Sequence, residues 1–169
     1  MPYEQLLQKA LGLISRHRYT VLKLKEKLVS YYEKQIEKGE LPPVSKTEKD
    51  QEIKKVLLRL KELRYLDDTQ YSKDFITTRT ELKPKGRFML QRELRKKGIH
   101  PDLAKRILEE TEIDENANAI KALEKRIPSL SKEPPFKRKQ KAMRFLASRG
   151  FNLEAIYNAI KYWYNKTEM

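Results

Sequence analysis

Few residues of this chain could perform acid–base, metal or nucleophilic chemistry. Its two histidines, His17 and His100, have no second histidine or carboxylate at the spacing that metal ligands usually show. Asp67 and Asp68 are adjacent in a predicted turn, where neighbouring side chains rarely converge on one reacting atom, and Asp68 is better explained as a helix N-cap. The sequence contains no cysteine, no glycine-rich phosphate loop and no nucleophile elbow. We therefore expect a protein that is not an enzyme and that uses no metal or cofactor.

Basic residues give the sequence its strongest binding signal. The 169 residues include 38 Lys and Arg against 24 Asp and Glu, which is a formal net charge of +14. Nearly all of that excess lies in two stretches, residues 82–106 and residues 132–149. Such clusters bind phosphate groups or acidic protein surfaces, with little sequence preference and a steep salt dependence. The predicted contact residues are Lys83, Lys85, Arg87, Arg92, Arg95, Lys96, Lys97, Lys137, Arg138, Lys139, Lys141, Arg144 and Arg149.

The elements that must position these residues are helices. Apolar residues recur at helical spacing, and no segment alternates apolar and polar residues long enough to predict a strand. Thr20, Asp68 and Asn152 are predicted N-caps, and Gly98 and Gly150 are predicted helix ends, because glycine readily adopts a left-handed backbone. The apolar stripes are 6–14, 21–32, 53–63, 71–76, 90–94, 103–108, 117–123, 142–146 and 156–163, with a break expected around Pro128.

The order of the helices repeats along the chain. Residues 94–99 superpose on residues 146–151 at an offset of 52, and the helices that follow align as well. A helix, a glycine stop and a second helix at this period indicate tandem repeats, with chance similarity of two such segments as the alternative. Each unit buries little apolar surface alone, so neighbouring units should pack together. We predict an all-α fold of three tandem three-helix repeats (1–66, 67–112 and 113–169) in an elongated, curved array.

The repeat also bears on the two basic clusters. A run of charge is usually only a solvated helix face, and that explanation stays open here. However, both clusters fall on the second helix of a predicted repeat, so repeat packing could place them on one surface. This duplication favours a binding function.

Three motifs resemble signatures of the bacterial RecX regulatory family. Residues 53–60 together with Tyr65-Leu66-Asp67-Asp68 resemble the first signature, residues 93–99 the second and residues 144–151 the third. Their order and spacing are similar to those of the family over nearly the whole chain. One departure is Arg64, where family members usually have glycine.

The resemblance implies a cytoplasmic modulator of RecA, the recombinase that polymerises on single-stranded DNA. Members of the family are all-helical, with three tandem three-helix repeats. They bind in the groove of the RecA–DNA filament, inhibit filament extension, ATP hydrolysis and strand exchange, and have no catalysis of their own. By this resemblance the protein would modulate recombination, DNA repair and the SOS response. We expect a monomer without a membrane segment that binds DNA directly only weakly.

Two other functions are compatible with the same basic residues. A sequence-nonspecific DNA-binding protein that acts without RecA would bind naked DNA tightly at physiological salt. A pure interaction scaffold would recognise an acidic protein other than RecA and leave recombination unaffected. An assay of RecA-catalysed ATP hydrolysis, with and without competitor DNA, would separate these functions.

Overall fold

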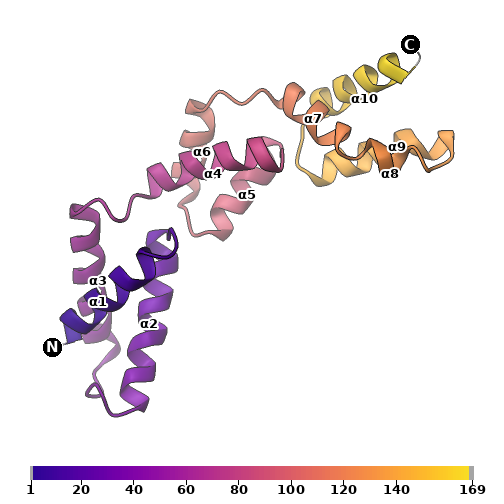
Figure 1. Ribbon diagram of the computed structural model, residues 1–169. Coiled ribbons are helices and arrows are strands. Elements are labelled where there is room, and N and C mark those ends of the chain that lie inside the picture. Colours follow the sequence, from indigo (N-terminus) through magenta and orange to yellow (C-terminus); the bar gives the residue numbers. More distant parts are fainter. Residues whose placement is uncertain (1, 168–169) are drawn as a thin grey trace. The chain divides into compact units, whose positions relative to one another are not determined.

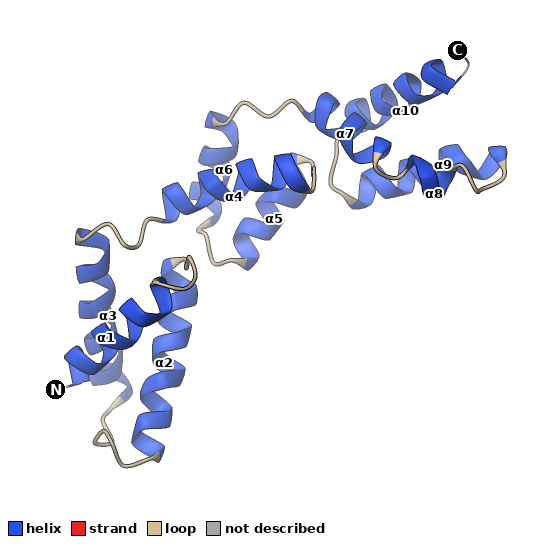
Figure 2. Cartoon of the chain, viewed as in Figure 1, coloured by secondary structure: helices blue, strands red, loops and turns tan. Residues whose placement is uncertain are grey.

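The computed structural model describes residues 2–167, which fold into ten helices with no strand (Figure 1, Figure 2). The predicted all-α class is therefore confirmed. The break expected around Pro128 is confirmed, because α7 ends at Glu124 and α8 begins at Ile127. Pro128 itself lies in the first turn of α8, where proline fits because that turn needs no N–H donor. The helices are α1 (Pro2–Ile14), α2 (Val21–Glu37), α3 (Lys46–Glu62), α4 (Asp68–Leu82), α5 (Arg87–Lys96), α6 (Pro101–Glu110), α7 (Glu115–Glu124), α8 (Ile127–Leu130), α9 (Pro135–Ser148) and α10 (Leu153–Thr167).

In chain order the helices form the sets α1–α3, α4–α6 and α7–α10, and the short α8 is an addition to the last set. Contacts divide the described residues into two compact units. Unit 1 comprises residues 2–71 and 97–99, and unit 2 comprises residues 72–96 and 100–167. The repeat boundaries at 66 and 112 stay a prediction.

The core of unit 1 is formed by the apolar stripes of α1, α2 and α3. Leu6, Leu24, Leu28, Ile53 and Leu60 are completely buried there. Burial of each such side chain stabilises the folded state by about 1.5–3 kcal/mol relative to exposure. These residues are spaced at helical periods on their own helices, so the sequence pattern identified this core.

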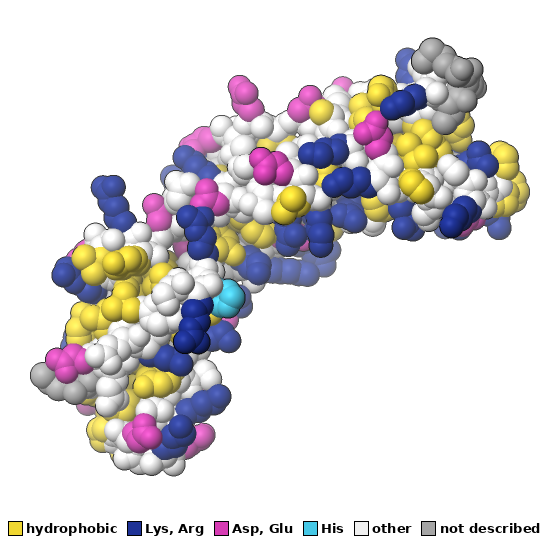
Figure 3. Space-filling model, in the orientation of Figure 1, with side chains coloured by type: hydrophobic (Ala, Val, Ile, Leu, Met, Phe, Trp, Pro, Cys, Tyr) yellow, Lys and Arg dark blue, Asp and Glu magenta, His cyan; other side chains and the backbone are white. Residues whose placement is uncertain are grey.

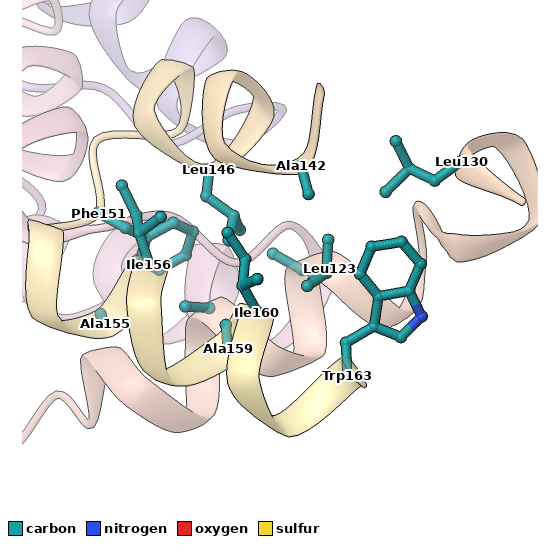
Figure 4. Close-up of a cluster of buried hydrophobic side chains, with 12 residues drawn as sticks. Leu123, Leu130, Ala142, Leu146, Phe151, Ala155, Ile156, Ala159, Ile160 and Trp163 are labelled. Atoms are coloured by element: carbon teal, nitrogen blue, oxygen red, sulfur yellow. The ribbon is translucent and has the colours of Figure 1, made fainter. Parts of the chain in front are cut away.

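Unit 2 contains a second core between α7, α9 and α10 (Figure 4). Leu123 comes from α7, Leu146 from α9, and Ile156, Ile160 and Trp163 from α10. The Trp163 side chain is 5% exposed. Because Trp163 is the only tryptophan of the chain, its fluorescence reports on the folding of unit 2.

The N-terminus of α2 is held by residues from far along the chain. Thr20 caps α2 as predicted, since its hydroxyl accepts a hydrogen bond from the Lys23 N–H (3.3 Å). The same hydroxyl donates to the carbonyl oxygen of Lys97 (2.5 Å). The Val21 N–H donates to the carboxylate of Asp68 (2.9 Å). These contacts satisfy donors that have no partner within the helix.

Asp68 was expected to cap α4, and that prediction is wrong. Asp67 caps α4 instead, because its carboxylate accepts a hydrogen bond from the Gln70 N–H (2.9 Å). The reason is positional: α4 begins at Asp68, and an N-cap side chain belongs to the residue that precedes the first helical residue. The two adjacent aspartates therefore cap two different helices.

The same arrangement recurs in unit 2 at the start of α5. The Arg87 N–H donates to the carboxylate of Glu115 (2.9 Å), and the Gly86 N–H donates to the carbonyl oxygen of Arg149 (3.0 Å). Asp114, which precedes Glu115, caps α7. In each unit, the first residue of an acidic pair caps its own helix and the second caps a helix from the preceding set.

Gly98 and Gly150 end their helices as predicted, with φ of 86° and 77°. A Cβ atom added at Gly98 would lie within 3.0 Å of the Leu22 side chain, and one at Gly150 would lie within 3.0 Å of Met89. Both positions thus combine a left-handed backbone with the close approach of another helix. Only glycine meets both requirements.

Protonation of Asp68 should change the stability of the protein. Burial raises the pKa of Asp68, although the N–H of Val21 and the charge of Lys61 oppose this rise. The folded protein therefore holds the proton more tightly than the unfolded chain, so this group adds stability as the pH falls through the raised pKa. Asp68→Asn keeps an acceptor for Val21. We expect its free energy of unfolding to equal or exceed that of the parent at neutral pH.

At about pH 4 the free energy of unfolding of the parent should rise relative to that of Asp68→Asn, because only the parent has a carboxylate at this position that can be protonated. Denaturant titrations of both proteins at the two pH values measure the difference. Asp68→Ala, which removes the acceptor, should be about 1 kcal/mol less stable than Asp68→Asn. If the free energies of unfolding of Asp68→Asn and the parent differed by the same amount at both pH values, burial of the Asp68 charge would not be unfavourable.

The backbone explains why Arg64 is unusual at its position. Its φ is 59°, in the left-handed region that favours glycine. The Arg64 side chain is exposed, so its removal costs little packing. We expect Arg64→Gly to raise the free energy of unfolding by about 0.5–1 kcal/mol, because relief of strain exceeds the entropy that glycine adds to the unfolded chain. In urea titrations the matched change Arg59→Gly, inside α3, should lower stability by about 1 kcal/mol. A lower free energy of unfolding in Arg64→Gly would contradict our interpretation that the positive φ of Arg64 strains the backbone.

Candidate partner-binding surface

The two helices that carry most of the predicted contact residues, α5 and α9, belong to unit 2. Their ends meet, because Gly86 precedes α5 and its N–H donates to the carbonyl oxygen of Arg149, which follows α9. The C-terminal end of α9 therefore lies at the N-terminal end of α5. Figure 3 shows Lys and Arg side chains over both helices.

Most of the predicted contact residues have exposed side chains. On α5, Arg92, Arg95 and Lys96 are exposed while Leu90 and Leu94 face the core, so the cations lie on the solvent side of the helix. On α9, Lys137, Lys141 and Arg144 form a similar exposed stripe, because residues spaced by four and three positions lie on one face of a helix. The exposed members of the predicted set are Lys83, Arg92, Arg95, Lys96, Lys97, Lys137, Lys139, Lys141 and Arg144; Lys97 belongs to unit 1.

Lys85 was predicted as a contact residue, and its ammonium forms an ion pair inside unit 2. Its partner is the carboxylate of Glu93 on α5, whose other oxygen lies 3.1 Å from the Arg79 guanidinium of α4. The side chains of Lys85, Glu93 and Arg79 are 15%, 20% and 32% exposed. Arg79 also lies over the ring of Phe75. This ion cluster links α4 to α5.

Arg87 likewise makes internal contacts. Its guanidinium donates to the carbonyl oxygen of Leu108, near the end of α6, and to those of Thr111 and Ile113 in the loop that follows. Carbonyl groups at a helix C-terminus lack partners within the helix, and a guanidinium satisfies several at once. Through its N–H and its side chain Arg87 connects α5 to α6 and α7.

In the last helix set, Arg138 and Lys141 are both tied to the segment before α9. Arg138 donates to the carbonyl oxygens of Glu133 (2.9 Å) and Ser131 (3.1 Å). Lys141 pairs with the Glu133 carboxylate (2.5 Å), and this hydrogen bond lowers the pKa of that carboxyl. These contacts hold the segment against α9, although half of the Lys141 side chain remains accessible to a partner.

Arg149 lies at the end of α9 beside an aromatic ring. Its guanidinium is 5.1 Å from the centre of the Phe145 ring, and that of Arg126 is 5.6 Å from the same centre. Cation–π contacts of this kind contribute about 0.5–1 kcal/mol where they are exposed. Arg149 is half-buried, so packing accounts for part of its role.

Two exposed aromatic residues were not among the predicted contacts. Phe88 and Phe136 are 68% and 77% exposed, and each is the second residue of a basic helix, α5 and α9. The Lys137 ammonium lies 5.6 Å from the centre of the Phe136 ring. The signal was present in the sequence, because each phenylalanine lies beside basic residues and off the apolar stripe of its helix.

Within residues 2–167, no helix has the length and apolar character needed to span a membrane. The same part of the chain has no group of three or more His, Asp or Glu side chains arranged to hold a metal ion.

Models of two known domains match this chain. The second three-helix domain of RecX matches residues 67–108, and the third three-helix domain of RecX matches residues 113–160. The regulatory protein RecX of Prosthecochloris aestuarii is 39% identical over 107 residues, which cover 63% of this chain and 69% of that protein. The regulatory protein RecX of Neisseria meningitidis serogroup C is 26% identical over 161 residues, which cover 95% and 92%.

Solved structures show the same fold. The crystal structure of RecX from Lactobacillus salivarius superposes with a TM-score of 0.74 and covers 95% of each chain. Its sequence identity to this chain is 19%. A second crystal structure, of a regulatory protein RecX, has the same TM-score and covers 95% of this chain and 73% of its own.

Proposed function

The chain belongs to the RecX family of regulatory proteins, and from this premise we propose that it binds RecA and the RecA–single-stranded DNA filament. By this proposal it inhibits filament extension, ATP hydrolysis and strand exchange, and so modulates recombination, DNA repair and the SOS response. It acts in the cytoplasm as a monomer without cofactors. By the same proposal the chain consists of the three repeats 1–66, 67–112 and 113–169, and the contacts lie in the second and third.

The observation that best supports this proposal is the exposure of the cations on α5 and α9. The two helices meet end to end in unit 2, and by this proposal their exposed cations would act as one extended basic surface. Acidic patches of RecA and phosphates of the bound DNA would both be attracted to it. A partner held at one helix is presented to the other at high effective concentration, so weak contacts add up to firm binding. A protein bound in this way would exclude duplex DNA from the filament.

RecA-catalysed ATP hydrolysis on single-stranded DNA tests the proposal directly. The protein is titrated at ratios well below one per RecA, with and without excess competitor DNA. Inhibition that persists in the presence of competitor supports a filament modulator. No inhibition, or inhibition that vanishes with competitor DNA, would contradict binding to RecA.

One observation favours a second function, nonspecific binding to single-stranded DNA without RecA. Phe88 and Phe136 are exposed among cations, and an aromatic ring beside positive charge can stack a base, which contributes about 1–3 kcal/mol per base. This function predicts tight binding to naked single-stranded DNA at physiological salt. It also predicts that Phe88→Ala and Phe136→Ala reduce that binding.

The solvent face of α5 can be tested with a matched pair of variants. We expect Arg92→Ala/Arg95→Ala to raise the concentration for half-inhibition of RecA by about tenfold and to flatten its salt dependence, because two phosphate or carboxylate contacts are lost. Lys105→Ala/Arg106→Ala on α6 removes the same charge from residues that form exposed ion pairs with Glu109 and Glu110. This control should inhibit like the parent. An equal loss of RecA inhibition in the two double variants would show that inhibition depends on the net charge of the protein and not on the position of the cations.

A further inference from the structure

Unit 1 contains a groove between α2 and α3 that none of the contacts proposed above uses. The cavity has a volume of about 480 Å³, which is in the usual range for ligand sites. Residues of α3 at helical spacing, from Thr47 to Lys61, form one wall, and Val21 and Lys25 of α2 form the other. With a rise of 1.5 Å per residue, this wall is roughly 21 Å long.

The floor of the groove is aliphatic. Leu57 is 6% exposed, as expected for the core face of α3. Its neighbour Leu58 is 48% exposed and lines the same cavity. An exposed leucine at the edge of a cavity loses apolar hydration when a partner covers it, which favours burial of an apolar side chain there.

The rim of the groove is positively charged. Among the described residues of the lining, Lys25, Lys54 and Lys61 are basic and Asp50 alone is acidic. Lys25 lies 3.7 Å from Asp50, and both side chains are more than 40% exposed, so this pair is a weak surface interaction. Lys54 and Lys61 lie on either side of the two leucines along α3, about two helical turns apart.

A second cavity of unit 1 provides a comparison. It has a similar volume, about 500 Å³, but three glutamates (Glu4, Glu48 and Glu52) line it against Lys55. Lys54 and Lys55 are adjacent in sequence and point into different cavities, because successive residues of a helix are rotated by about 100°. The groove between α2 and α3 therefore differs in charge from this neighbouring cavity, although the two lie on the same helix α3.

We infer that this groove is a docking site for an acidic segment of a protein partner that carries a large apolar side chain. The apolar side chain would cover Leu58, and flanking carboxylates would meet Lys54 and Lys61. A nucleic acid fits less well, because none of the described residues that line the groove is aromatic and could stack a base, and its leucines would desolvate phosphate without compensation. The site is independent of the proposed RecA contacts on α5 and α9.

Fluorescence polarisation with the full chain tests this inference. The probe is a short fluorescein-labelled peptide with a central Leu-Phe pair flanked by Glu and Asp. We expect a Kd of about 0.1 mM, as is reasonable for one anchored side chain with rim charges. A peptide with Gln and Asn in place of the acidic residues should bind at least about fivefold more weakly.

Matched variants locate the binding. Lys54→Glu should weaken binding of the acidic peptide by about five- to tenfold, and Leu58→Ser by about tenfold. Lys55→Glu makes the same charge change one residue away, and Leu11→Ser removes another exposed leucine, from α1; both should bind within about twofold of the parent. Circular dichroism verifies that all four variants are folded.

Several outcomes would overturn the inference. These are failure of the acidic peptide to bind at millimolar concentration, equal binding of the neutral peptide, and equal loss in the control variants. Displacement of the peptide by oligo(dT) with the same sensitivity to Leu58→Ser would assign the groove to nucleic acid instead. None of these results depends on RecA, so the proposed RecA function could hold or fail separately.

Discussion

Gly86→Ala should lower the free energy of unfolding of unit 2 by about 3 kcal/mol or more, at or beyond the upper end of the usual cost of overpacking. A Cβ atom at this position would lie within 3.0 Å of the carbonyl group of Gly150 and the Cα atom of Phe151. These are backbone atoms, so no side chain can rotate away. The clash would separate the ends of α5 and α9 and break the hydrogen bond from Gly86 to Arg149. Denaturant unfolding followed by Trp163 fluorescence measures the loss.

Gly12→Ala is the matched control for this substitution. A Cβ atom at Gly12 would meet nothing within 4 Å, and Gly12 lies inside α1. Its replacement by alanine should therefore raise stability by about 0.5–1 kcal/mol, measured by circular dichroism. If Gly86→Ala were as stable as the parent, the close approach of residues 149–151, which follow α9, to the start of α5 would be refuted. The proposed basic surface, which depends on this approach, would then lose its support.

The second large effect is expected at Glu93. Glu93→Gln keeps the shape of the side chain but leaves the cations of Lys85 and Arg79 without their shared negative charge. All three side chains are less than one-third exposed, so solvent compensates only in part. We expect a loss of about 2–3 kcal/mol, somewhat below the cost of breaking a fully buried pair. Trp163 fluorescence and circular dichroism should show the transition shifted in the same direction.

Glu109→Gln makes the same chemical change in an exposed pair of unit 2. Glu109 lies 3.9 Å from Lys105, and both side chains are about two-thirds exposed. Its loss should cost no more than about 0.5 kcal/mol. Similar effects at the two positions would mean that the cluster around Glu93 is open to water. Lys85 would then be available to a partner, as the sequence had suggested.

The helices and their ends could be predicted because they depend on neighbours in sequence. Apolar spacing identified the core stripes of α2, α3 and α10. Glycine identified the ends at Gly98 and Gly150, since its freedom at positive φ is a local property. The basic clusters on α5 and α9 were likewise visible, because side chains opposite an apolar stripe face the solvent. The departure at Arg64 was also local, and its positive φ accounts for it.

The helix that a carboxylate caps could not be predicted from its neighbours alone. Asp67 follows the local rule for α4, but Asp68 caps α2, which precedes it by 47 residues. The groove beside Leu58 has the same origin, because its walls come from two helices that only the packed unit brings together.

The sequence by itself determined which residues form helices, which face of each helix is apolar and where positive charge accumulates. Only the tertiary structure decided which charges remain for a partner. Lys85 and Arg87 are as basic as Arg92 and Arg95, but Glu93 binds the first, and carbonyl groups at the end of α6 and in the loop after it bind the second. The reason is that periodicity and backbone preference act within a few residues. An ion pair or a capped helix end depends on groups distant in sequence, and only packing brings them within hydrogen-bond distance.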